Sequence, residues 1–167
     1  MVEFVKKPTD EFVQSNMPDN AFEAANIDAV LLTDINNQLV WGFQHESLLN
    51  SRQSLVNLIT QGDTALVKIL PTSAEIALHK VSSRSGYLVL DGQLIYFSNT
   101  TILPSAAVGE IVGSLTMFRL LDSDLIKDIS QLSLIDFSIQ PTTKTTNTSD
   151  DFFSFSKLKL LALRTPG

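Results

Sequence analysis

Histidine and cysteine, the residues most often used in metal sites and in nucleophilic catalysis, are scarce in this chain. It has two histidines, His45 and His79, and no cysteine. The histidines lie far apart in the sequence, and neither has a second histidine at the spacing of metal ligands. Disulfide scaffolds, cysteine-zinc sites, iron–sulfur clusters and thiol catalysis are excluded. We therefore expect no metal and no cofactor, with both histidines at the surface or at the rim of a pocket.

The sequence motifs of common catalytic and nucleotide-binding sites are also missing. There is no Gly-x-Ser-x-Gly, no P-loop, and no Gly-x-Gly-x-x-Gly after a strand. Gly109 and Gly113 fit a turn followed by a close-packed position inside a strand. The neighbouring carboxylates at 150–151 fit a solvated loop better than acid–base catalysis. We therefore expect that the protein is not an enzyme. A small hydrolase is the least favoured of the functions considered.

A set of larger side chains has the character of a binding site for a small molecule. Tyrosine and tryptophan combine an apolar body with one polar atom, and an arginine at a strand end can bind a carboxylate through two parallel hydrogen bonds. The structural alternatives are core aromatics with satisfied polar atoms and arginines in surface ion pairs. The candidate ligand-binding residues are Trp41, His79, Arg84, Tyr87, Tyr96, Ser98 and Arg119.

The composition indicates an acidic globular protein. The chain has 167 residues, of which 44% are hydrophobic and 18% charged, so we expect one domain over residues 1–167. The formal net charge is −6, which disfavours nucleic-acid binding because phosphates need a basic surface. No stretch reaches the roughly 18 apolar residues of a membrane span, and Met1 opens no signal-peptide pattern.

Several apolar runs predict the strands of an antiparallel sheet. The runs at 29–33 and 39–43 flank a turn rich in Asp and Asn, which predicts a β-hairpin. A run rich in Val, Thr, Met and Phe predicts a long strand over 111–121. A further strand is expected near 135–139 and a final one within 152–164. The stretch 141–151 between them, rich in Thr, Asn and Ser, is expected to be a mobile loop.

The strongest strand signal is a second hairpin around Asp91-Gly92, a sequence typical of two-residue turns. The turn fixes the register, so that Tyr87 faces Tyr96. Both faces of this hairpin are then apolar, whereas a sheet with one wet face alternates apolar and polar residues. We therefore expect both faces to be covered. One face carries Tyr87, Val89, Leu94 and Tyr96, and the other carries Leu88, Leu90, Ile95 and Phe97.

Helices are predicted on either side of these strands in the sequence. Short helices are expected to begin near Thr9 and Pro18, and Asp122 or Ser123 begins a later amphipathic helix. Residues 44–83 form a mostly helical insert, which includes a capping box at Thr72. We expect the N-terminal helix to cover one face of the sheet and the insert the other, an α+β fold. The space between insert and sheet is a natural place for a small ligand.

The order of these motifs resembles the fourth type of CHASE domain. The similar blocks run from Glu11-Phe12-Val13-Gln14-Ser15-Asn16 through Gly86-Tyr87-Leu88-Val89-Leu90-Asp91-Gly92 and Gly109-x-x-x-Gly113-Ser114-Leu115 to Arg119-Leu120-Leu121-Asp122. The resemblance covers about residues 3–140. This chain departs from the family pattern at Thr101 and Glu110, where proline is usual, and it lacks the Trp-Asp of the first helix.

The resemblance implies a PAS-like or Cache-like sensor domain without catalytic activity. Such a domain would lie in the periplasm, between two transmembrane helices outside this sequence, as the input of an inner-membrane receptor histidine kinase, diguanylate cyclase or phosphodiesterase. The implied partners are an unidentified small-molecule ligand and a second copy of the receptor, with no nucleic acid and no other membrane contact. A protein-interaction or dimerisation module without a small-molecule ligand remains the alternative.

Overall fold

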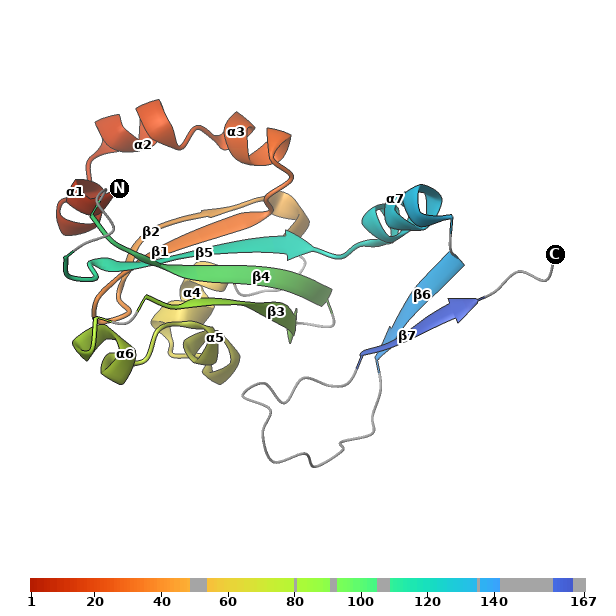
Figure 1. Cartoon of the computed structure of the whole chain (residues 1–167). Helices are drawn as coiled ribbons and strands as arrows, with labels where there is room; N and C mark the ends of the chain where they lie inside the picture. The colour runs from red at the N-terminus through yellow and green to blue at the C-terminus, as the bar shows by residue number, and fades with distance from the viewer. Residues whose placement is uncertain are drawn as a thin grey trace. The chain divides into compact units, whose positions relative to one another are not determined.

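The structure, a computed structural model, describes residues 1–48, 54–79, 81–90, 93–104, 109–134, 136–141 and 158–163. The chain divides into two compact units, Met1–Leu120 and Leu121–Gly167. The first unit is a sheet with helices on both sides (Figure 1). Residues 142–151 of the expected mobile loop and the Asp91-Gly92 turn lie outside the described residues.

Five antiparallel strands form the sheet, in the order β2-β1-β5-β4-β3. Strand β5 is central and pairs with β1 on one side and with β4 on the other. Both predicted hairpins are present, as β1–β2 and β3–β4. The expected α+β fold with a PAS-like central antiparallel sheet is therefore confirmed. The strands are β1 (Ala29–Asp34), β2 (Leu39–Gln44), β3 (Ser83–Leu90), β4 (Gln93–Ile102) and β5 (Gly113–Leu120).

The β3–β4 hairpin has the register that its turn sequence predicts. Tyr87 pairs with Tyr96, and Leu88 pairs with Ile95. Successive side chains of a strand point to opposite faces of the sheet, so Leu88, Ile95 and Phe97 share one face and the tyrosines share the other. The three apolar side chains are buried. They form the part of the core that lies beneath the insert.

Three short helices cover the β1–β2 side of the opposite face (Figure 1). They are α1 (Val2–Lys6), α2 (Asp10–Asn16) and α3 (Asp19–Ala24). The helices at Thr9 and Pro18 are confirmed as α2 and α3, whereas α1 was not predicted. Their apolar side chains form a cluster with the sheet whose buried members are Phe4, Val5, Met17, Leu32 and Ile102.

The same face is open over β3 and β4, which differs from the prediction. Tyr87 is 43% exposed and Tyr96 is 37% exposed, and Val89 and Met117 beside them are exposed as well. The expectation that both faces of the β3–β4 hairpin are covered is therefore wrong among the described residues. The N-terminal helices are short. Their apolar side chains pack over β1 and β2, against Leu32 and its neighbours.

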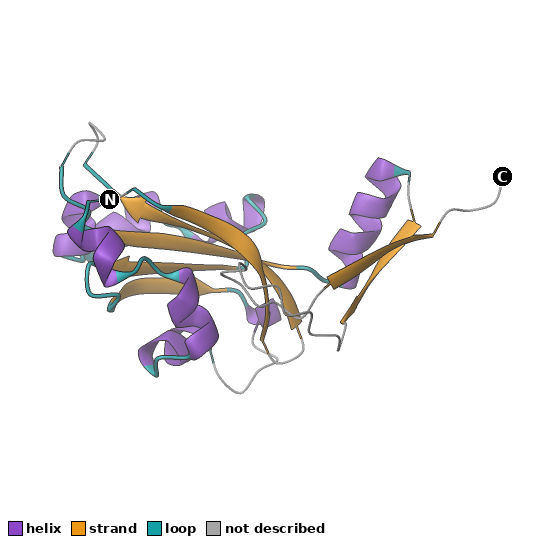
Figure 2. Cartoon of the chain, turned by 60° about the horizontal axis from the view of Figure 1, so that its bottom comes forward, coloured by secondary structure: helices purple, strands orange, loops and turns teal. Residues whose placement is uncertain are grey.

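The insert lies on the other face of the sheet, as expected (Figure 2). It contains a 3-10 turn, Glu46–Leu48, and the helices α4 (Leu55–Thr60), α5 (Thr64–Ile69) and α6 (Ser73–Ala77). Its first helix was predicted from residue 51 but begins after Ser54, whose side chain caps it. The helix α5 was not predicted. The capping box that begins α6 is present as predicted.

Gly113 occupies the close-packed position that its place inside a strand predicts. A Cβ atom at this residue would lie 2.0 Å from the carbonyl oxygen of Thr33, well inside van der Waals contact. Gly113 pairs with Asp34 of β1 and with Ile102 of β4. Glycine therefore allows β5 to enter the sheet between its two neighbours.

The second unit contains α7 (Ser123–Ser133) and the antiparallel pair β6 (Asp136–Pro141) and β7 (Leu158–Leu163). Asp122 caps α7 as predicted, because its Oδ1 accepts a hydrogen bond of 2.8 Å from the backbone NH of Leu125. Both strands fall where the sequence predicts them. Within the described parts of the chain, none of the helices is long and apolar enough to span a bilayer.

Candidate functional site

Beneath the insert, the sheet carries a row of buried polar side chains, here called the polar strip: Thr33, Asn99, Ser114 and Thr116. They share the insert face because Thr33 pairs with Ser114, and Asn99 pairs with Thr116. Thr33 Oγ1 and Ser114 Oγ lie 2.9 Å apart. Asn99 Nδ2 donates to Ser114 Oγ at 3.1 Å and to Thr116 Oγ1 at 2.8 Å. The strip is thus a connected hydrogen-bond network inside an otherwise apolar layer.

Among the described residues, three buried side-chain atoms have no hydrogen-bond partner. They are Asn99 Oδ1, Ser82 Oγ and Asn37 Oδ1. Asn99 has an exposed fraction of 0% and Ser82 of 8%. A buried polar atom without a partner costs about 1–3 kcal/mol, and such atoms are rare in folded proteins. Each of these atoms can take a hydrogen bond from a further molecule, water included.

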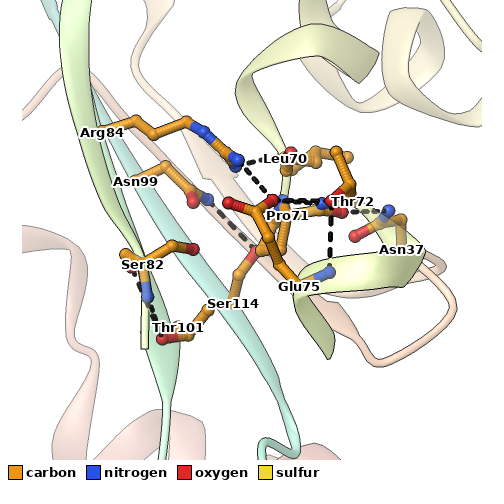
Figure 3. Close-up of polar contacts among 10 residues, drawn as sticks. All are labelled: Asn37, Leu70, Pro71, Thr72, Glu75, Ser82, Arg84, Asn99, Thr101 and Ser114. Atoms are coloured by element: carbon orange, nitrogen blue, oxygen red, sulfur yellow. Dashed lines mark hydrogen bonds and ion pairs between the residues drawn. The ribbon is translucent and has the colours of Figure 1, made fainter. Parts of the chain in front are cut away.

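The other polar atoms of Ser82 and Asn37 are hydrogen-bonded, those of Ser82 to the sheet and that of Asn37 to the insert (Figure 3). The backbone NH of Ser82 donates to Oγ1 of Thr101, a residue of β4 two positions after Asn99. Asn37 Nδ2 donates to the carbonyl oxygen of Pro71 at 3.1 Å. A carbonyl oxygen only accepts, so this bond fixes the amide of Asn37 with its oxygen left free.

Arg84 joins the sheet to the insert at the edge of the polar strip. Its register partner on β4 is Asn99. Nη1 of Arg84 donates to the carbonyl oxygen of Leu70 at 2.8 Å, and Nη2 forms an ion pair with Glu75 of α6 (Figure 3). Both side chains of the pair are largely buried. The guanidinium is thus occupied by two partners from the insert.

Glu75 is held in its ionised form by the same contacts. Its Oε2 accepts hydrogen bonds of 2.8 Å from both the backbone NH and the hydroxyl of Thr72, in addition to the bond from Arg84. The backbone hydrogen bond from Thr72 and the hydrogen bond from Arg84 lower the pKa of Glu75 to about 2. Its carboxylate therefore stays charged at every physiological pH.

Glu75→Gln is expected to destabilise the protein by about 1 kcal/mol at pH 7, because glutamine keeps an acceptor for the cap but loses the ion pair with Arg84. The folded pKa lies below the ordinary value of 4.5. The stabilisation by the carboxylate is therefore complete above about pH 4.5 and is lost as the pH falls toward 2. Urea unfolding of both proteins from pH 7 to pH 2 measures this. A difference that stays constant over that range would contradict it.

The structure separates the sequence-predicted site residues into two groups on opposite faces. Arg84 lies on the insert face beside the polar strip. Tyr87, Tyr96, Ser98 and Arg119 come together on the open face, where Tyr96 pairs with Arg119. The tyrosine rings are 5.4 Å apart, at 59° to each other. A single site made of all these residues is therefore not formed.

Trp41 and His79 lie elsewhere, and Arg119 on the open face is bonded to protein partners. Trp41 of β2 packs against Phe22 of α3, with ring centroids 6.0 Å apart, and belongs to the layer beneath the N-terminal helices. His79 is exposed after α6. Arg119 donates to the carbonyl oxygen of Asn26, and its Nε lies 4.0 Å from Asp28 Oδ2. These contacts match the structural alternatives for tryptophan and arginine.

Sequence reasoning missed Asn99, the centre of the polar strip, although a signal was present. The face that carries Ile95 and Phe97 continues along β4 to Asn99 and Thr101. A polar residue at the next position of an apolar stripe marks a buried polar group that needs partners. Extending the alternation beyond the hairpin would have identified it.

The side chains at this site are suited to hydrogen bonding. Among the described residues, no group of three His, Cys, Asp or Glu side chains is placed to hold a metal ion. The strip offers hydroxyl and amide groups, and beside it the carboxylate of Glu75 is already paired with the guanidinium of Arg84. Such groups orient and recognise a small molecule.

Comparison with known families gives one clear match. A family model described as the CHASE4 domain matches residues 1–140 of the chain. The matched region includes the whole five-stranded sheet, both sets of helices on it, α7 and nearly all of β6. No curated protein matches the chain.

Proposed function

We propose, because the chain belongs to the CHASE4 family of sensor domains of signalling receptors, that it is the periplasmic ligand-sensing domain of a bacterial transmembrane receptor. The sensory role comes with the family. The small-molecule ligand, the attached histidine kinase, diguanylate cyclase or phosphodiesterase, and the absence of catalysis are parts of this proposal. In the full-length receptor, transmembrane helices outside this sequence would anchor the domain, and two copies would associate.

The observation that supports ligand binding most strongly is the buried amide of Asn99, one polar atom of which has no hydrogen-bond partner among the described residues. It lies on the insert face of the sheet, beside the contact between Arg84 and α6. A ligand that supplied its missing hydrogen bond would recover the cost of burying it. Such a ligand would contact the sheet and the insert together and would favour one arrangement of the two.

Strand β5 connects this site with the cluster under the N-terminal helices and with the C-terminal end of the first unit at Leu120. Its Ser114 and Thr116 belong to the polar strip, while Leu115 between them packs against the cluster formed by the N-terminal helices. The end of the strand is held by Asp28, whose Oδ2 accepts a 2.8 Å hydrogen bond from the backbone NH of Leu120. The chain then continues directly into α7. A coupling of about 1–3 kcal/mol along this path would suffice to bias an attached output domain.

The open face supports the alternative, a protein-interaction or dimerisation module without a small-molecule ligand. Exposed Tyr87, Tyr96, Val89 and Met117 are close neighbours on one face of the sheet. An exposed apolar surface of this kind is typical of an interaction site. The two functions are compatible, but only the first requires that a small molecule bind under the insert.

The proposed function is tested by thermal unfolding of the whole chain against a broad panel of amino acids, organic acids, polyamines, polyols and amides. A compound present at ten times its Kd would stabilise the folded state by about 1.4 kcal/mol and raise the Tm by about 3–6 °C. No rise with any compound, together with dimer formation in sedimentation equilibrium, would reject ligand sensing in favour of the alternative.

A further inference from the structure

His45, which follows β2, belongs to a chain of hydrogen bonds that ends at the last residue of β5. The backbone NH of Ser47 donates to Nδ1 of His45 at 3.2 Å, and Oγ of Ser47 lies 3.0 Å from the same nitrogen. The Ser47 hydroxyl donates to Oδ1 of Asp28 at 3.3 Å. The other carboxylate oxygen, Oδ2, accepts the backbone NH of Leu120 at 2.8 Å. A titratable ring is thus connected through two side chains to the end of the central strand.

The partner of Nδ1 decides the form in which this ring is held. A backbone NH can only donate, so Nδ1 of His45 carries a lone pair and the ring is neutral, with its hydrogen on Nε2. Turning the ring over would place a carbon atom against the NH and remove this hydrogen bond. In the neutral form the single hydroxyl hydrogen of Ser47 has two acceptors within reach, Nδ1 and the carboxylate of Asp28. It can serve only one of them at a time.

A proton on Nδ1 would rearrange these hydrogen bonds, because it turns this atom from an acceptor into a donor. The ring could no longer accept the backbone NH of Ser47. It could instead donate to Oγ of Ser47, whose hydroxyl would then be free to stay on Asp28. The positive ring would also be attracted to the Asp28 carboxylate, which lies 4.0 Å from Nε of Arg119. The two charge states of His45 therefore favour two different hydrogen-bond arrangements.

The turn around His45 also contacts β4 and the insert. Nε2 of Gln93, the first residue of β4, donates to the carbonyl oxygen of Ser47 at 3.3 Å. Oε1 of Gln44 accepts the backbone NH of Leu55, the first residue of α4, at 2.8 Å. Neither β4 nor α4 contains a charged residue. The charged residues of the other segments around His45 are Asp28, Glu46 of the 3-10 turn, Asp19 and Glu23 of α3, and Arg119 of β5.

We propose that His45 is a proton-operated switch at the end of β5, so that the domain responds to pH between 8 and 5, the range in which histidine changes charge. At the upper end of this range the neutral ring holds the backbone NH of Ser47. At the lower end the ring donates to the Ser47 hydroxyl and, through Asp28, changes the support of Leu120, where the first unit ends. The inference goes beyond the proposed function and shares no side chain with the polar strip.

Nuclear magnetic resonance of the whole chain from pH 8 to pH 5 tests the switch. We expect the backbone amide signals of Ser47 and Leu120 to shift with the same midpoint as the ring signals of His45. Once the ring is protonated, the Ser47 amide should exchange with solvent about three- to tenfold faster, after correction for the pH dependence of intrinsic exchange, because its hydrogen bond is lost. A His45 ring that titrates while both amides stay unchanged would overturn the inference.

Three variants locate the response. His45→Gln removes the titrating ring, so neither amide should shift between pH 8 and pH 5. Ser47→Ala keeps the backbone NH but removes the hydroxyl, so the ring should still titrate while the Leu120 amide no longer follows it. His79→Gln, at the exposed second histidine, is the matched control and should leave both shifts unchanged.

A shift of the Leu120 amide that survives His45→Gln would overturn the inference, since another group would then be the source. Survival of this shift in Ser47→Ala would also overturn it, because the signal would not pass through the Ser47 hydroxyl. Neither result bears on the proposed small-molecule site, because no compound is added in these measurements.

Discussion

Phe118→Ala is expected to destabilise the protein by about 3–5 kcal/mol, the range typical for removal of a buried aromatic side chain. Phe118 lies in the central strand β5 with an exposed fraction of 1%. Its neighbours across the strands are Ala29 and Phe97. None of the strands beside it can move in to fill the space without breaking its own hydrogen bonds. Urea unfolding followed by far-UV circular dichroism measures the change.

The matched control for this prediction is Met117→Ala, at the neighbouring position on the open face. Met117 is exposed, so its truncation should cost less than about 1 kcal/mol. Equal losses for the two variants would contradict the assignment of the insert face as the buried one. If Phe118→Ala leaves too little folded protein to measure, Phe118→Leu replaces it. We expect this variant to lose less unfolding free energy than Phe118→Ala but more than Met117→Ala.

Leu66→Ala is expected to cost about 2–5 kcal/mol, because Leu66 of α5 is fully buried. The substitution leaves the hydrogen bond from the Leu66 backbone NH to Asp63 in place. It therefore removes packing without removing the helix N-terminus. Since the insert forms one wall of the proposed site, a compound found to bind the chain should also bind this variant more weakly.

Val67→Ala, one residue further along α5, is the control for Leu66→Ala. Val67 has an exposed fraction of 48%, and its truncation should change the free energy of unfolding by less than about 1 kcal/mol. Thermal unfolding of the two variants with and without ligand gives both quantities. A small loss for Leu66→Ala would mean that α5 does not dock as described.

The sheet could be predicted because its signals are local. The Asp-Gly turn sets the register of Tyr87 against Tyr96 without reference to the rest of the chain. The Thr72–Glu75 capping box likewise needs only four consecutive residues. The order in which the strands pair, with β5 between β1 and β4, was not predicted, since no local signal specifies a pairing between distant strands.

The site was harder to predict because it depends on which face each helix covers. Tyr87 and Tyr96 look like pocket residues in the sequence, but the N-terminal helices pack over β1 and β2 and leave them open. Asn99 looks like an ordinary strand residue, yet it is fully buried. The burial of its amide among the hydroxyls of Ser114 and Thr116 is a property of the folded structure, which composition and spacing do not show.

Hydrogen–deuterium exchange of the whole chain, with and without a compound that raises its Tm, tests the central claim most directly. Binding at the polar strip should slow amide exchange in α6, in β4 around Asn99 and in β5 around Ser114. Exchange in the N-terminal helices near Phe4 should change less. Protection confined to the N-terminal helices, with none in these three segments, would contradict a ligand site between the insert and the sheet.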